Sequence, residues 1–109
     1  MRLPFAEQAV VAERKITHYL LNPEHPEGGS KARYFLSVGH DPAAIERFRD
    51  DLLELARTSN VEELPSRFGP KYVGVGFVTP PQGGRVQVQT IWILRNGAPP
   101  PLLVTAYAA

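Results

Sequence analysis

Residues 71–95, KYVGVGFVTPPQGGRVQVQTIWILR, decide the fold because they contain two runs in which apolar side chains alternate with other residues. One face of the first run carries Val73, Val75 and Phe77. Its other face carries two glycines, which leave it flat and open to a close neighbour. One face of the second run carries Val86, Val88, Thr90, Trp92 and Leu94. Since the Pro-Pro-Gln-Gly-Gly segment between the runs is typical of a turn, the stretch predicts an antiparallel hairpin.

The segments on either side of the hairpin predict an α+β architecture. Residues 102–107 predict a last strand, and residues 41–57 predict a helix with Asp41 as its N-cap and a stripe of apolar residues facing one way. Residues 13–21 and 30–38 also have helical spacing, the second with Ser30 as its N-cap. We therefore predict two or three N-terminal helices packed on a C-terminal antiparallel β-meander of three to four strands. The helix at 45–55 should cover one face of the sheet.

Length and composition predict a single globular domain over residues 1–109, with 43% hydrophobic residues. The absence of cysteine excludes a disulfide framework, a thiol nucleophile and a cysteine-based zinc site. No apolar run is long enough to cross a bilayer, and the first residues lack a secretory signal pattern. We therefore expect a cytoplasmic protein, or one delivered by a larger machine, with no membrane partner.

The charges are distributed unevenly along the chain. The net charge is only +1, but all eleven acidic residues lie within residues 1–63, beside eight basic ones. Residues 64–109 contain four basic residues and no acidic residue: Arg67, Lys71, Arg85 and Arg95. A field of one sign favours anionic partners. The alternative is a chance asymmetry in a sheet-rich segment, where acidic residues are disfavoured.

Residues 15–35, KITHYLLNPEHPEGGSKARYF, crowd polar and basic side chains into a short connection between apolar runs. His25 lies between two prolines and has the intrinsic pKa of a general acid or base. Taken alone, it is more simply a solvated loop histidine. Lys31 strengthens the functional interpretation, because a lysine near a helix N-terminus is unfavourable for the helix but favourable for binding an anion.

Other common chemistries find little support in the sequence. The three histidines include no HxxxH-type pair, and the carboxylates are scattered along a solvated face, so we predict no metal site. There is no phosphate-binding GxxxxGK loop, no dinucleotide fingerprint and no serine on a strand-to-helix turn. His40, beside Asp41, is predicted to be a turn residue. We expect no cofactor.

Two groups of polar residues lie on the predicted strands. Arg85, Gln87 and Gln89 form a row that suits either the open face of a half-buried sheet or a groove for a polyanion. Thr105 and Tyr107 share one face of the last strand and could offer hydroxyl groups to a phosphate. Threonine and tyrosine are also ordinary strand residues.

The segments KITHYLLNPEHPEGGSKARYF, VQTIWIL and LLVTAY together resemble a family of small bacterial domains, over nearly the full chain. Such domains occur as stand-alone proteins and as tails of toxin-like polypeptides. The matching positions are Lys15, Tyr19, Asn22, His25, Gly28, Lys31, Trp92 and Thr105. Their order of helices followed by a meander is similar to the barnase/EndoU/RelE-like ribonuclease superfamily, which is an analogy of fold.

The chain departs from the pattern of this family at one position. Where the family has arginine before L-V-T-A-Y, this chain has Leu102. If that arginine binds the scissile phosphate, the chain should be a weak or inactive enzyme unless Arg85 or Arg95 substitutes for it.

The resemblance and the basic residues together predict a metal-independent endoribonuclease of the toxin type. His25, Lys31, Lys15 and Thr105 are the predicted catalytic residues, with His25 as the proton-transferring group. The predicted substrate-binding residues are Arg33, Arg85, Arg95 and Tyr107. The predicted partners are RNA and an acidic antitoxin or immunity protein that binds over the positive sheet. The alternative is a non-catalytic module that binds protein or nucleic acid through the sheet.

Overall fold

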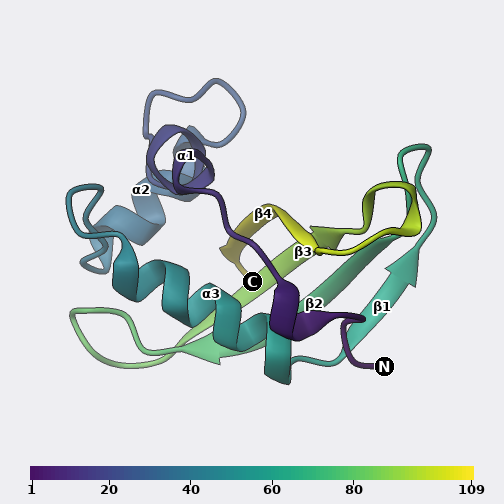
Figure 1. Ribbon diagram of the computed structural model, residues 1–109. Coiled ribbons are helices and arrows are strands. Elements are labelled where there is room, and N and C mark those ends of the chain that lie inside the picture. The colour runs from purple at the N-terminus through teal and green to yellow at the C-terminus, as the bar shows by residue number, and fades with distance from the viewer.

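The computed structural model describes residues 1–109 and confirms the predicted α+β architecture (Figure 1). The helices come first: α1 (Glu13–Lys15), which continues as the π-helical turn η2 (Ile16–Leu20), then α2 (Gly29–Ser37) and α3 (Glu46–Thr58). The strands follow as β1 (Val61–Leu64), β2 (Lys71–Val78), β3 (Val86–Ile93) and β4 (Leu102–Ala108). Two short 3-10 turns complete the chain, η1 (Ala6–Gln8) and η3 (Arg95–Gly97).

The four strands form one antiparallel meander in the order β1-β2-β3-β4. In the central hairpin Tyr72 lies opposite Trp92 and Gly74 lies opposite Thr90. The glycine face of β2 and the Trp92 face of β3 are therefore on the same side of the sheet. A bulge between β3 and β4 shifts the register, because Ile91 lies opposite Thr105 while Trp92 lies opposite Leu103. A bulge bends a strand and re-aims its side chains.

Helix α3 packs on the face of the sheet that carries the two glycines of β2. A Cβ atom on Gly76 would lie 2.4 Å from Leu55 Cδ2, so the helix approaches where the strand has no side chain. The core between these layers is built around Trp92, Phe35 and Phe48, which are at most 1% exposed. The outer face of β2 is open, since Val75 and Phe77 are 41% and 52% exposed. The predicted coverage of one face by this helix is confirmed.

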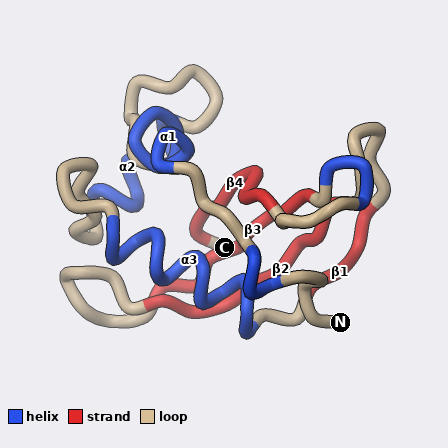
Figure 2. Tube along the Cα trace, viewed as in Figure 1, coloured by secondary structure: helices blue, strands red, loops and turns tan.

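The N-terminal helices lie beside β4, at the edge of the sheet (Figures 1 and 2). The chain reaches them through an extended segment that runs along β4. Val10 N–H donates to Pro101 O at 2.9 Å, and Leu103 N–H donates to Val10 O at 3.1 Å. These two bonds fix α1 and η2 against the strand that carries Thr105. No helix of the chain has the length and apolar character that a membrane span requires.

Two local predictions were wrong, and one strand was not predicted. Helix α3 begins at Glu46 and not at Asp41, because the Asp41 carboxylate accepts from Ala43 N–H at 2.8 Å and closes a separate turn. Helix α2 begins at Gly29, so Ser30 is not its N-cap. Strand β1 was not predicted, since only its first residue, Val61, is buried and its four residues VEEL do not alternate.

Candidate active site

The loop between η2 and α2 holds His25 in one orientation. Its Nδ1 accepts hydrogen bonds from the backbone N–H groups of Glu27 and Gly28, both at 3.1 Å. Gly29 N–H donates to the His25 carbonyl at 2.9 Å, so the loop folds back over its own histidine. Because a nitrogen that accepts cannot also carry a hydrogen, the neutral ring carries its proton on Nε2. His25 can therefore donate a hydrogen bond through Nε2, but it is not set up to take a proton there.

Tyr19, on η2, links three of the predicted catalytic residues. Its hydroxyl lies 2.8 Å from the Thr105 hydroxyl, and its ring packs edge-on against His25 with centroids 4.8 Å apart. Lys15 Nζ, one helical turn earlier, lies 5.3 Å from the centre of the same ring. We call Lys15, Tyr19, His25 and Thr105 the Tyr19 cluster.

The backbone of Gly28 lets the loop close against Tyr19. A Cβ atom on Gly28 would lie 2.6 Å from Tyr19 Cε1, closer than carbon atoms pack. Glycine at this position therefore allows the histidine loop and the tyrosine ring to touch.

Lys31, on α2, lies over the neighbouring part of β4. Its Nζ is 4.5 Å from the centre of the Tyr107 ring, and the Tyr107 hydroxyl accepts a hydrogen bond from Gln89 Nε2. Thr105 and Tyr107 are two positions apart on one strand, so their side chains lie on the same face roughly 7 Å apart. Tyr107 thus places Lys31 beside the Tyr19 cluster.

The lysines of this region have no carboxylate partner. The one salt bridge of the structure joins Arg57 and Glu54 at 2.7 Å, on the exposed side of α3. No group of three or more histidine, aspartate or glutamate side chains could hold a metal ion. The charge of Lys15 and Lys31 is therefore available to an anion from outside the chain.

The four predicted substrate-binding residues lie in different places. Tyr107 is beside the Tyr19 cluster, while Arg33 reaches back to Pro23 O at 3.4 Å in the histidine loop. Arg85 lies on the Phe77 ring, 4.0 Å from its centre, near the turn between β2 and β3. Arg95 is at the opposite end of β3. The two arginines of the sheet are thus separated by the length of a strand.

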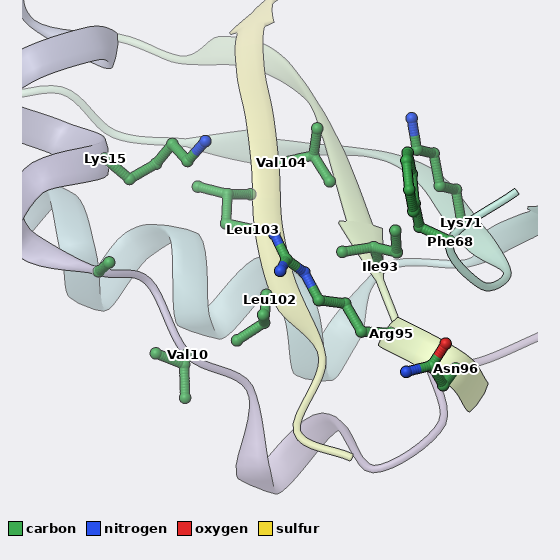
Figure 3. Close-up of a pocket in the computed structure, with 11 residues that line it drawn as sticks. Val10, Lys15, Phe68, Lys71, Ile93, Arg95, Asn96, Leu102, Leu103 and Val104 are labelled. Carbon is green, nitrogen blue, oxygen red and sulfur yellow. The ribbon is translucent and has the colours of Figure 1, made fainter. Parts of the chain in front are cut away.

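A surface cavity of about 550 Å³ lies at the Arg95 end of the sheet. Three basic side chains line it, Lys15, Lys71 and Arg95, together with apolar residues and Asn96, and no carboxylate does. Figure 3 shows Arg95 extending past Leu102 toward Leu103, while Lys15 approaches β4 from the helix side. Leu102 therefore shares this cavity with an arginine from η3, the turn after β3, and that arginine is Arg95 and not Arg85.

His40, which the sequence predicted to be a turn residue, has a buried side chain. It is 5% exposed, and its ring lies 4.2 Å from that of Phe48 in the core. Burial, with a smaller contribution from Arg47, lowers the pKa of His40 from 6.5 to about 4. This histidine belongs to the core and not to the candidate site.

The prediction from sequence missed the central position of Tyr19. The helical spacing placed its ring on the core-facing side, and the half-buried ring does pack against the core, but it also lies between His25 and Thr105. The signal that could have found it is the four-residue spacing from Lys15, which puts a cation over an aromatic ring on one face of a helix. Phe68 and Lys71, in the cavity, were also not assigned to a site.

Comparison with known proteins gives a family and a fold. Residues 2–109 match the family described as "Domain of unknown function (DUF6883)", so the chain belongs to this family. None of the curated proteins matches the sequence.

One solved structure with a similar fold is a chain of a contact-dependent growth inhibition toxin–immunity protein complex from Klebsiella pneumoniae 342. The TM-score is 0.69 over 95% of this chain and 96% of that chain, with 12% sequence identity. At this identity the likeness is one of fold. The relation to the barnase/EndoU/RelE-like superfamily stays a prediction.

Proposed function

We propose that this DUF6883 domain is a toxin-type ribonuclease that cleaves RNA without a metal ion, at the Tyr19 cluster and Lys31. The observation that carries the proposal is that two lysines without a carboxylate partner lie against the rings of Tyr19 and Tyr107, beside the paired hydroxyl groups of Tyr19 and Thr105. Cations and hydroxyl donors that converge without a carboxylate suit a phosphodiester group better than a peptide or a metal. The fold shared with a chain of a toxin–immunity complex adds a biological context.

The reaction we propose is attack of the ribose 2′ oxygen on phosphorus, with departure of the 5′ oxygen. His25 would donate from Nε2 to a non-bridging phosphate oxygen, because its Nδ1 is already occupied by two backbone N–H groups. This differs from the proton transfer, as general acid or general base, that the sequence suggested for His25. Lys31 would protonate the departing 5′ oxygen, and the 2′ proton would pass to water.

The remaining residues of the site would position the phosphate. The Tyr19–Thr105 hydroxyl pair is fixed by its own hydrogen bond and offers one donor to an anion. Lys15 would stabilise the charge that develops in the transition state. Arg33, Arg85 and Arg95 are spread along the molecule and would hold flanking nucleotides.

A toxin of this kind implies an immunity partner, which we propose to be acidic. Residues 64–109 contain no carboxylate, and the outer face of β2 exposes Val75 and Phe77 beside Arg85. An acidic partner would meet opposite charge there, which accelerates association and excludes basic competitors. The matched complex contains a toxin and an immunity protein. The proposal that this chain is the toxin therefore depends on the chemistry of the Tyr19 cluster.

A second function, a non-catalytic binding module, is favoured by two observations. Leu102 occupies the place of an arginine, and the protonation site of His25 is occupied by backbone donors. Such a module would bind RNA or a protein partner and leave RNA intact.

Induced expression separates the two functions. We expect growth arrest with RNA cleavage from the wild-type chain, and neither from His25→Ala or Lys31→Ala. Arg57→Ala is the matched control, because it removes one positive charge on the far side of α3. Soluble wild-type protein with normal growth and intact RNA would exclude the toxin and leave the binding module.

A further inference from the structure

The cavity at the Arg95 end of the sheet has the make-up of a nucleotide site. Its apolar part is formed by the side chains of Val10, Ile93, Leu102, Leu103 and Val104. The basic groups of Lys15, Lys71 and Arg95 stand around it without a carboxylate. A nucleoside monophosphate combines a flat apolar base with an anionic phosphate, which is the chemistry that this lining complements. The volume of about 550 Å³ is in the range of small-molecule sites.

Phe68 gives the cavity an exposed aromatic ring. It is 63% exposed and lies at the cavity beside Lys71 (Figure 3), and the Arg67 guanidinium carbon lies 5.4 Å from the centre of its ring. A large aromatic side chain left in water beside basic residues is a typical stacking platform for a nucleic-acid base. Phe68 therefore offers the cavity a surface on which a base can stack.

The backbone around Phe68 is firmly held. Asn96 N–H donates to Phe68 O at 2.9 Å, and Leu94 N–H donates to Pro70 O at 3.1 Å, so the two loops that border the cavity are joined. Gly69 has a φ of +127°, and a Cβ atom there would lie 2.0 Å from the Leu94 carbonyl oxygen. Only glycine allows this contact. The backbone that carries the Phe68 ring is therefore held in place by hydrogen bonds and close packing.

Lys15 connects the cavity to the Tyr19 cluster. Its side chain lines the cavity, and its Nζ also lies 5.3 Å from the centre of the Tyr19 ring. A strand of RNA bound at the cluster would thus place its next nucleotide in the cavity, whose lining contains no carboxylate. Arg95, whose side chain extends past Leu102, would bind the phosphate of that next nucleotide.

From these observations we infer that the cavity is the subsite for the nucleotide next to the cleaved bond, with its base on Phe68 and its phosphate at Arg95. The inference rests on the proposed function for its place in the reaction. The binding itself is a separate property, which can be measured without cleavage.

Adenosine 5′-monophosphate is the probe for this subsite. Its binding is measured from the changes in the amide chemical shifts of the intact chain. We expect the shifts to be centred on Phe68, Lys71, Arg95 and Leu102. Phe68→Leu removes the ring but keeps an apolar side chain, and should weaken binding at least about fivefold, since one stacked base is worth about 1 kcal/mol or more. Arg95→Gln should weaken binding of the monophosphate but not of adenosine. The control Arg57→Gln should bind the monophosphate like the wild type.

The possible outcomes separate this inference from the proposed ribonuclease. RNA cleavage together with monophosphate binding that neither Phe68→Leu nor Arg95→Gln weakens would overturn the subsite and leave the enzyme. Shifts confined to His25 and Tyr19 would overturn it in the same way. Saturable binding at the cavity without any RNA cleavage would support the nucleotide site and reject the ribonuclease.

Discussion

The hydroxyl groups of Tyr19 and Thr105 lie 2.8 Å apart although 86 positions separate the two residues in the chain. Tyr19 comes from the turn after α1, and Thr105 from the last strand, so this bond joins the first helical segment to the edge of the sheet. Around it lie His25 and Lys15, which the sequence had selected for their chemistry. Because this bond joins residues far apart in the chain, the Tyr19 cluster forms only when the helices pack on the sheet.

The first prediction concerns this bond. Tyr19→Phe keeps the ring against His25 and removes the hydroxyl, so the free energy of unfolding should fall by about 1 kcal/mol. In a double-mutant cycle with Thr105→Val, we expect a coupling energy of about 1 kcal/mol, measured by urea unfolding. Strictly additive effects would mean that the two hydroxyl groups do not interact in solution.

A second prediction concerns Gly28. A Cβ atom there would meet Tyr19 Cε1 at 2.6 Å, so Gly28→Ala should push the ring away from the histidine loop. We expect a loss of stability of about 1–3 kcal/mol, as for other overpacked sites, and a larger loss of RNA cleavage than for Gly83→Ala. Gly83 lies in the exposed turn between β2 and β3, where a Cβ atom meets nothing within 4 Å, but its φ of +89° adds some strain to that control. Equal cleavage by the two alanine variants would contradict this account.

The third prediction uses the buried pair of Trp92 and Thr90. Trp92 Nε1–H donates to Thr90 Oγ1 at 3.0 Å, and both residues are at most 1% exposed. Thr90→Val keeps the shape and leaves the indole N–H without a partner, which should cost about 1–3 kcal/mol. Fluorescence of Trp92, the only tryptophan, reports the unfolding transition directly. A Thr90→Val variant as stable as the wild type would show that the indole finds another acceptor.

The fourth prediction concerns pH. The folded state lowers the pKa of His40 from 6.5 to about 4, so the unfolded chain binds its proton first as the pH falls. Stability due to the neutral His40 is therefore complete above pH 6.5 and is lost between pH 6.5 and about pH 4, by about 3 kcal/mol in all. Asp51 acts in the opposite direction, because burial raises the pKa of its carboxyl group and the folded state then takes up a proton more readily.

His40→Phe tests this assignment, because it replaces the imidazole with an aromatic ring of the kind already packed around it. Urea unfolding at several pH values between 4 and 7 should show a flatter profile for the variant than for the wild type. The same slope in both proteins would mean that another group is responsible for the loss of stability in acid.

Much of the fold could be predicted because its signals are local. The alternation in β2 and β3 and the apolar stripe of α3 are visible in short windows, and the glycines of β2 indicated the face that a neighbour approaches. The start of α3 could not be predicted, because Asp41 and Pro42 favour a helix N-cap and a separate turn equally well. In the structure they form the turn, in which the Asp41 carboxylate accepts a hydrogen bond from Ala43 N–H. Strand β1 depends on pairing with β2 and has no pattern of its own.

The candidate site was harder to predict, because its geometry depends on long-range contacts. Residue type, local position and the family resemblance selected His25 and Lys31, and their relation to Thr105 and Tyr107 came only with the packing of the helices on β4. The occupied Nδ1 of His25 depends on the path of the loop backbone, which no side-chain pattern encodes. The cavity joins residues from four separate segments, so neither Phe68 nor Lys71 stood out in the sequence.

The most direct test of the central claim is incubation of the purified chain with RNA in the presence of a chelator, with analysis of the new RNA ends. The account predicts cleavage that the chelator does not affect, with 2′,3′-cyclic phosphate ends. It also predicts that His25→Ala and Lys31→Ala, folded like the wild type, lose cleavage at least about a hundredfold, while Arg57→Ala keeps it. Intact RNA with the wild-type chain, or cleavage that survives in both variants, would contradict the account.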